Sequence, residues 1–156
     1  MCSIGGFLSS APLPAHLTDM LCRALLFYGE PRGSHSSGIF IHDEILKAAE
    51  PANTFIQSKS LRTLLSRPAS LALTHNRLPT SGGQTDLHAH PFRCGNTASV
   101  HNGHISNVEA LKAQFDLKLE TDVDSEVLTA ALDAHGPEKL LEIVAAAQGN
   151  AALAAV

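Results

Sequence analysis

Aromatic residues are scarce in this sequence, and tryptophan is absent. Phe, Tyr and Trp together make up 4% of the 156 residues, whereas 44% of the residues are hydrophobic. A core must therefore be built mainly from Leu, Val, Ile and Ala. The length and apolar content suffice for one buried core, so we expect a single domain spanning residues 1–156.

Clustered basic residues are also missing. The formal net charge is −4, and the sequence contains no run of Lys and Arg. Nucleic acids and anionic membrane surfaces both favour proteins with clustered positive charge. The sequence therefore predicts neither nucleic acid nor a membrane as the main partner.

Long apolar runs are absent as well. No uninterrupted apolar segment reaches the ~18 residues of a membrane-spanning helix. The first basic residue is Arg23, and Pro12 and Pro14 interrupt the apolar stretch near the N-terminus. We therefore do not expect a signal peptide.

The few cysteines do not form a recognisable disulfide pattern. There are three of them, Cys2, Cys22 and Cys94, which is an odd and widely spaced set. Such a set is not typical of a disulfide framework. A reducing, cytoplasmic location is therefore expected.

Hydrophobic periodicity predicts an alternation of strands and helices. Strands are predicted at 2–8, 38–42, 70–75, 98–102 and 149–156, and helices at 17–28, 58–66, 106–115, 124–134 and 137–147. Residues 43–49 fit either a neighbouring strand or a helical turn. The order predicts a mixed α and β domain, but it does not determine the topology.

Three further features refine these boundaries. Residues 76–97 show almost no periodicity, and loops of that length are usually functional or mobile. Ser106 and Glu109 have the spacing of a capping box at a helix start. The last predicted strand reaches Val156, so we expect the domain to be incomplete at its C-terminus.

Nine histidines raise the question of a metal site. His88-Ala89-His90 and His101-x-x-His104 could each supply a pair of ligands. However, no acidic or cysteine ligand is spaced to complete a recognisable zinc site. We expect no metal and no cofactor, and a histidine-rich metal protein remains a weaker alternative.

Cys2 directly follows the initiator methionine. Methionine is normally removed before a small second residue, which would leave a thiol and a free α-amine on Cys2. The unperturbed pKa of an α-amine is about 7.7–8.0 and that of a thiol about 8.5. A neutral amine could take the thiol proton, so one residue could supply both nucleophile and base. The alternative is a small second residue without a catalytic role.

Four other residues would suit a site for an amino-acid amide. Arg77 could hold a carboxylate in a bidentate pair, and Asp124 could hold an ammonium group. The side chain of Asn102 and the backbone N–H of Gly103 could face a developing oxyanion. Each has a structural alternative: a solvated loop charge for Arg77, an N-cap for Asp124, and a turn for Asn-Gly.

Six motifs occur one after another along the chain, and the first of them contains Cys2. They are M-C-x-I-x-G, R-G-x-x-S-x-G, R-x-x-T-x-G, A-H-P-F, H-N-G-x-x-x-N and D-S-E-V-L. This ordered set resembles the class II glutamine amidotransferases, such as the glutaminase domains of glucosamine-6-phosphate synthases and amidophosphoribosyltransferases. The resemblance implies an α+β fold, the four-layer αββα sandwich of the N-terminal nucleophile hydrolases.

The resemblance also implies a role for each matched residue. Cys2 would be the mature N-terminus and nucleophile, with Arg32 supporting it. Asn102 and Gly103 would form the oxyanion hole. The glutamine-binding residues would be Arg77 for the α-carboxylate, Asp124 for the α-amine, and Thr80 and Gly82 in the loop lining the substrate.

The implied reaction is hydrolysis of L-glutamine. The thiolate attacks the side-chain amide carbon, ammonia leaves, and water hydrolyses the γ-glutamyl thioester. Family members normally pass the ammonia to a synthase domain, and no such domain is expected within residues 1–156. The acceptor is therefore expected in a partner or a missing domain, and a homodimer is left open.

The sequence departs from the family pattern at three positions. His35 stands where the family usually has Asp, and Leu78 and Ser81 differ from the W-A-T-H version of the substrate loop. The segments Pro79-Thr80, His-Asn-Gly and Asp-Ser-Glu-Val-Leu are more similar to the amidophosphoribosyltransferases, whereas Ala89-His90-Pro91 is more similar to the glucosamine-6-phosphate synthases. The acceptor branch is therefore unsettled. His35 and the early end of the chain also support an alternative, a non-catalytic relative that binds glutamine or acts as a scaffold.

Overall fold

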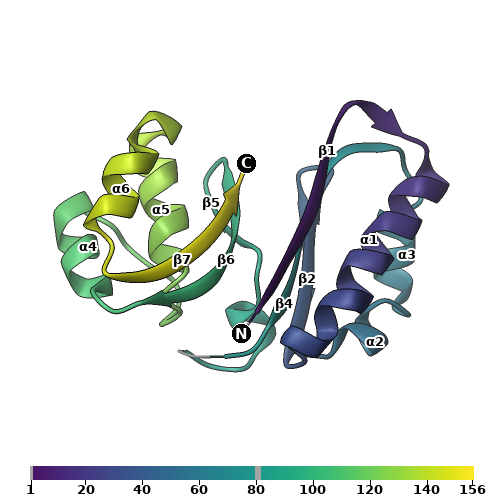
Figure 1. The fold of residues 1–156 in the computed structure, drawn as a ribbon, viewed down its shortest axis with the longest axis horizontal. Helices are drawn as coiled ribbons and strands as arrows, with labels where there is room; N and C mark the ends of the chain where they lie inside the picture. The colour runs from purple at the N-terminus through teal and green to yellow at the C-terminus, as the bar shows by residue number, and fades with distance from the viewer. Residues whose placement is uncertain (1, 80–81) are drawn as a thin grey trace.

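The computed structural model describes residues 2–79 and 82–156. Two antiparallel sheets face each other, and helices cover their outer sides (Figure 1). The strands are β1 (Ser3–Leu13), β2 (Ser36–Ile41), β3 (Glu44–Ala48), β4 (Ala69–Arg77), β5 (Phe92–Cys94), β6 (Thr97–Ile105) and β7 (Gly149–Ala155). The α-helices are α1 (Ala15–Gly29), α2 (Ala52–Phe55), α3 (Lys59–Leu64), α4 (Val108–Phe115), α5 (Glu126–His135) and α6 (Leu140–Ala146).

The first sheet has the strand order β1-β4-β2-β3, with every neighbouring pair antiparallel. Helices α1, α2 and α3 pack against its outer side (Figure 1). The apolar side chains between sheet and helices include Cys22, Leu26, Ile39, Ile41, Phe55, Leu61 and Leu65. All of these side chains are buried, and only Phe55 among them is aromatic, so this core consists mainly of aliphatic residues.

The second sheet has the order β5-β6-β7 and is also antiparallel. Helices α4, α5 and α6 cover the side that faces away from the first sheet (Figure 1). Their shared core includes Ile105, Leu111, Phe115, Val127, Leu128 and Ile143. The four layers are thus helix, sheet, sheet and helix, so the predicted αββα sandwich is confirmed.

The layer between the sheets follows from strand alternation, because successive side chains on a strand point to opposite faces. On β4, Asn76 faces the helices, where its Nδ2 donates to the carbonyl oxygen of Leu26 at 3.0 Å. Leu73 packs against Val100 of the second sheet, so His75 and Arg77 lie on that same inner face. The inner face of β4 is therefore apolar at Leu73 and polar at His75 and Arg77, towards the end of the strand.

Several predicted strand boundaries were wrong. Strand β1 continues to Leu13 rather than ending at residue 8, and β4 continues to Arg77, which therefore belongs to a strand and not to a loop. Strand β6 passes through Gly103 and ends at Ile105 because β7 pairs with it along that whole length. Residues 44–48 form the strand β3, which settles the two alternatives for that segment.

The predicted capping box at Ser106 was also wrong. Helix α4 begins at Val108, and its N-cap residue is Asn107, which makes no side-chain cap bond. The Ser106 hydroxyl donates instead to the carbonyl oxygen of Gln148 at 3.0 Å. The Glu109 carboxylate pairs with Lys112 at 2.9 Å. Both side chains therefore have other partners than the helix terminus.

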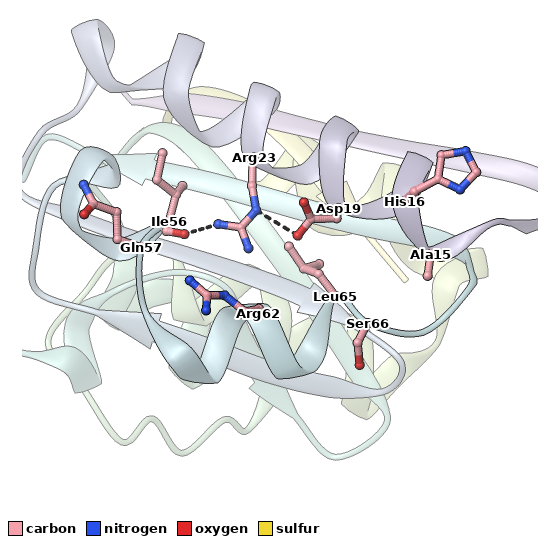
Figure 2. Close-up of a pocket in the computed structure, with 9 residues that line it drawn as sticks. All are labelled: Ala15, His16, Asp19, Arg23, Ile56, Gln57, Arg62, Leu65 and Ser66. Carbon is pink, nitrogen blue, oxygen red and sulfur yellow. Dashed lines mark hydrogen bonds and ion pairs between the residues drawn. The ribbon is translucent and has the colours of Figure 1, made fainter.

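A solvent-open hollow lies in the helical layer outside the first sheet (Figure 2). It is lined by residues of α1 and of the segment from Ile56 to Ser66. The guanidinium group of Arg23 lies in this hollow and donates to Asp19 at 2.8 Å and to the Ile56 carbonyl. The charge of Arg23 is thus paired within the protein. None of the predicted site residues that the structure describes lines this hollow. Within the described part of the chain, no helix is both long and apolar enough to cross a membrane.

Candidate active site

Cys2 directly precedes β1, and two segments that are distant in the sequence contact it there. Its backbone N donates to the Oδ1 atom of Asn102 on β6 at 3.2 Å. The Nε atom of Arg32 donates to the carbonyl oxygen of Cys2 at 3.1 Å. The structure thus brings together the predicted nucleophile, one predicted oxyanion residue and the predicted supporting arginine.

The thiol of Cys2 lies against the backbone of Leu78. The distances from Sγ are 3.4 Å to the Leu78 nitrogen and 3.5 Å to its carbonyl oxygen. Burial raises the pKa of the thiol, while the Leu78 N–H and the Arg77 charge act in the opposite direction. Since Leu78 contributes through its backbone, its departure from the family residue does not remove this contact.

The R-G-x-x-S-x-G motif runs beside the end of β4. Gly33 packs so closely that a Cβ there would collide with the backbone of Asn76 and Arg77. The backbone N of His35 donates to the carbonyl oxygen of Arg77 at 3.1 Å, and the His35 side chain is exposed. The close approach places Arg32 beside Cys2, and the histidine departure falls on a solvent-facing side chain.

Arg77 is buried on the inner face of the first sheet, with 3% of its surface exposed. Its Nη1 donates to the carbonyl oxygen of Gly83 at 2.7 Å. Burial lowers the pKa of the guanidinium, and the nearby Cys2, Asp124 and Asp122 oppose that shift. The arginine therefore supplies positive charge in the neighbourhood of the thiol.

The loop after Arg77 approaches the segment before α5. Gly82 has a φ of +71°, a left-handed conformation that favours glycine, and a Cβ there would lie 2.7 Å from Cγ2 of Val123. The Gly83 N–H lies 3.4 Å from Oδ1 of Asp122. Gly82 is thus next to the Asp124 segment. Thr80, predicted to line the substrate, lies outside the described residues.

Asp124 is buried but does not cap a helix. Helix α5 begins at Glu126 with Ser125 as its N-cap residue, so the structural alternative of an N-cap was wrong. The Oδ2 atom of Asp124 accepts a hydrogen bond from the Ile105 N–H at 2.7 Å and lies 3.3 Å from Nδ1 of His104. The carboxylate therefore connects the segment before α5 to the end of β6.

Asn102 and Gly103 are part of β6 and not a turn between elements. Because Oδ1 of Asn102 accepts from the Cys2 nitrogen, its Nδ2 is the donor of that side chain. A Cβ on Gly103 would collide with the backbone of Asn150 on β7. Glycine at this position thus permits the close strand pairing that carries the strand past Asn102.

Three buried histidines near these residues were not predicted as part of the site. His75 Nε2 is 2.9 Å from the carbonyl oxygen of His101, and the ring of His90 stacks on His75 with centroids 4.0 Å apart. His101 Nδ1 is 2.7 Å from the Ser125 hydroxyl. Strand alternation could have indicated His75, because it shares a face with Arg77. Among the described residues, no group of three or more His, Cys, Asp or Glu side chains is arranged to hold a metal ion.

Comparisons with known proteins bear on the family and the fold of this chain. No protein-family model matches the chain. The isomerizing glutamine–fructose-6-phosphate aminotransferase of Rhizobium leguminosarum bv. viciae is 33% identical over 138 residues, covering 85% of this chain and 22% of the relative. The aminotransferase of the same name from Mycobacterium leprae (strain TN) is 34% identical over 143 residues, covering 81% of this chain and 22% of the relative.

The fold also has a solved counterpart. The structure of glutamine phosphoribosylpyrophosphate amidotransferase from B. subtilis, complexed with ADP and GMP, matches with a TM-score of 0.68 at 19% identity. The match covers 100% of this chain and 35% of that chain, and at this identity it concerns the fold.

Sequence and fold together identify the chain as a class II glutamine amidotransferase domain of the N-terminal nucleophile type. The domain spans 22% of the length of the two curated relatives described above.

Proposed function

We propose that this chain hydrolyses the side-chain amide of L-glutamine to glutamate and ammonia through a thioester on Cys2. The observation that carries the proposal is the hydrogen bond from the Cys2 nitrogen to Oδ1 of Asn102, at 3.2 Å. It joins the N-terminal residue to the best candidate for an oxyanion donor. The proposed reaction needs no metal or cofactor.

The N-terminal amine would act as the base. Removal of Met1 would convert the Cys2 amide nitrogen into an α-amine with an ordinary pKa of about 7.7–8.0. Burial raises the pKa of the Cys2 thiol, so a base within the same residue would be needed to form the thiolate. The contact with Asn102 would hold that amine in place.

The chemical steps follow from this pairing. The amine takes the thiol proton, and the thiolate attacks the amide carbon to give a tetrahedral intermediate. Nδ2 of Asn102 and the N–H of Gly103 stabilise its oxyanion. The leaving nitrogen takes the proton and departs as ammonia. Water then attacks the γ-glutamyl thioester, which releases glutamate and restores the thiol.

Substrate binding would use the charged residues around the thiol. Arg77 would hold the α-carboxylate of glutamine, and Asp124 would hold the α-ammonium group. Supporting this assignment, the charges of both residues act on the Cys2 thiol, so both are near it. Thr80 and Gly82 would line the substrate loop, and Arg32 would hold the Cys2 carbonyl.

We further propose that the ammonia passes to an accepting domain. The two curated relatives are named as aminotransferases and are much longer than this chain, which covers 22% of each. A second, ammonia-consuming domain or subunit would therefore be the partner. A reducing cytoplasmic compartment would suit the mechanism, because Cys2 must remain a free thiol.

A glutamine-binding module without turnover is the second candidate. The observation in its favour is the burial of Cys2, which is 8% exposed and has a thiol pKa above its ordinary value. A protonated, covered thiol would bind substrate without attacking it. The two candidates make different predictions for ammonia release from bound glutamine.

The test is ammonia release by the purified chain, after intact mass has shown that Met1 is removed. Cys2→Ala should bind glutamine and release no ammonia, because no nucleophile remains. Cys94→Ala, the same change at a half-buried cysteine on β5, is the matched control and should retain activity. Wild-type ammonia release by folded Cys2→Ala would refute the mechanism. Binding without turnover by the wild-type chain would establish the binding module.

A further inference from the structure

The backbone of β6 has one edge paired with β7 and one edge that is only partly paired. In an antiparallel strand, the N–H and C=O of one residue point to the same side, and those of its neighbours point to the other. Ala98 exchanges two 2.9 Å backbone hydrogen bonds with Val156, and the Ser106 N–H donates to the Gln148 carbonyl at 2.8 Å. The backbone N–H and C=O groups of even-numbered residues of β6 thus point towards β7. Those of odd-numbered residues point towards the side of β5.

Strand β5 covers only the first part of that other edge. Its last register pair is Phe92 with Ser99. The described pairing with β5 therefore ends before His101. His101, Gly103 and Ile105 turn their backbone groups towards the uncovered edge.

Side chains take the place of the missing strand on both sides of Gly103. His75 Nε2 donates to the His101 carbonyl oxygen at 2.9 Å, and Asp124 Oδ2 accepts from the Ile105 N–H at 2.7 Å. The Gly103 N–H lies between these two contacts on the same edge. It is the backbone donor that the proposed oxyanion site requires.

His75 is well suited to hold this backbone. The carbonyl oxygen of His101 can only accept, so Nε2 of His75 carries the proton. The side chain is 1% exposed, and its ring stacks on His90 at an interplanar angle of 24°. Gly38 allows the backbone carbonyl of His90 to pack against β2, which fixes the stacked ring from behind.

We propose that His75 is a positioning residue for the oxyanion site. This proposal rests on the proposed glutaminase function. By holding the His101 carbonyl, it sets the peptide plane between His101 and Asn102. That plane determines where the Asn102 side chain and the Gly103 N–H point. Displacement of catalytic groups by about 1 Å can cost roughly 100-fold in rate, so this single hydrogen bond has a measurable consequence.

The kinetic test compares His75→Gln with His75→Met. The two side chains have similar shapes, but only glutamine can donate to the His101 carbonyl. His75→Met should lower kcat by roughly 10- to 100-fold and leave KM for glutamine unchanged, because the oxyanion contact is made in the transition state. His75→Gln should recover most of kcat. Equal kcat values in the two folded variants would overturn the proposal.

A second measurement does not depend on turnover. In nuclear magnetic resonance spectra of uniformly ¹⁵N-labelled protein, His75→Met should shift the amide signals of Asn102 and Gly103 more than that of Ile105, which Asp124 holds. His75→Gln should shift them less. Unchanged Asn102 and Gly103 signals in folded His75→Met would overturn the positioning role. Absence of ammonia release by the wild-type chain would instead refute the proposed function alone.

A further variant covers the case in which His75→Met does not fold. His90→Leu removes the ring that stacks on His75 and leaves the His75 donor in place. The loosened His75 should then lower kcat with little change in KM. An unchanged kcat in folded His90→Leu would count against the proposal.

Discussion

The layer between the two sheets has two ends with opposite chemistry. One end is apolar and consists of Phe40, Leu73, Ala98 and Val100. The other end is polar, and it includes the buried residues His75, Arg77 and Asp124 and the half-buried Asn102. Strands β4 and β6 contribute to both ends, and on β4 the change occurs within the two-residue step from Leu73 to His75. Strand alternation thus places part of the candidate site on the same inner strand faces that pack the two sheets together.

The two ends differ in what they contribute to stability. Burying apolar surface stabilises the fold by roughly 25 cal/mol per Å². Burying polar groups costs free energy unless each finds a partner. At the polar end, Nδ1 of His75 and both ring nitrogens of His90 have no hydrogen-bond partner among the described residues. We infer that the apolar end holds the sheets together, whereas the polar end carries the residues of the proposed reaction.

The largest expected effect that separates the two ends is on turnover. Asn102→Ala removes a proposed oxyanion donor and should lower kcat for glutamine hydrolysis by about 10²–10³-fold. Asn150→Ala, the same change at an exposed position of the neighbouring β7, is the matched control. Steady-state ammonia release measures both. Equal kcat values in the two variants would remove Asn102 from the mechanism.

The next effect is on stability and arises at the apolar end. Leu73→Ala leaves a cavity between the sheets and should lower the free energy of unfolding by about 3 kcal/mol. The folded fraction should keep its kcat, because Leu73 contacts apolar side chains and not the site. Chemical denaturation and ammonia release measure the two quantities. A normal unfolding free energy would show that the apolar end is not what joins the sheets.

A smaller effect concerns acid. Burial lowers the pKa of His75 to about 3, and it also lowers the pKa values of His90 and His101. Unfolded histidine titrates near 6.5, so below that pH the unfolded chain binds protons that the folded chain does not. Unfolding free energy should therefore decrease as pH falls from about 6.5 towards 3. Each histidine contributes at most roughly 1.4 kcal/mol per pH unit.

The histidine contribution can be isolated by substitution. His75→Gln removes one titrating group and should make the decrease in unfolding free energy between pH 7 and pH 5 shallower. His16→Gln, at an exposed histidine, is the control and should follow the wild-type curve. Denaturant titrations at the two pH values give the slopes. Identical slopes for His75→Gln and wild type would contradict the account of the polar end.

Local apolar periodicity predicted many of the helices and strands, whereas the resemblance to a family implied the αββα sandwich. The helix around Leu17–Leu26 and the strand around Ser70–His75 follow from spacing alone. The ordered motifs also predicted that Cys2, Arg32 and Asn102 would meet, and the structure places them in hydrogen-bond contact. These predictions rest on residue spacing within short segments and on the order of motifs that the chain shares with a family.

The rest depends on contacts between distant segments. Asn-Gly is common in turns, yet here it continues a strand because β7, far along the chain, pairs with it. Ser106 has the spacing of a cap but bonds to Gln148. Asp124 precedes a helix but accepts from Ile105. No local pattern reveals such partners, so sequence spacing could not assign these side chains.

The most direct test of the central claim is the covalent state of Cys2. The chain is incubated with glutamine and quenched in acid, and the N-terminal peptide is examined by mass spectrometry. The proposed mechanism predicts that this peptide begins at Cys2 and carries one γ-glutamyl group as a thioester. Cys2→Ala should carry none. Ammonia release by a chain that retains Met1, or with the glutamyl group on another residue, would contradict the claim that the N-terminal cysteine is the nucleophile.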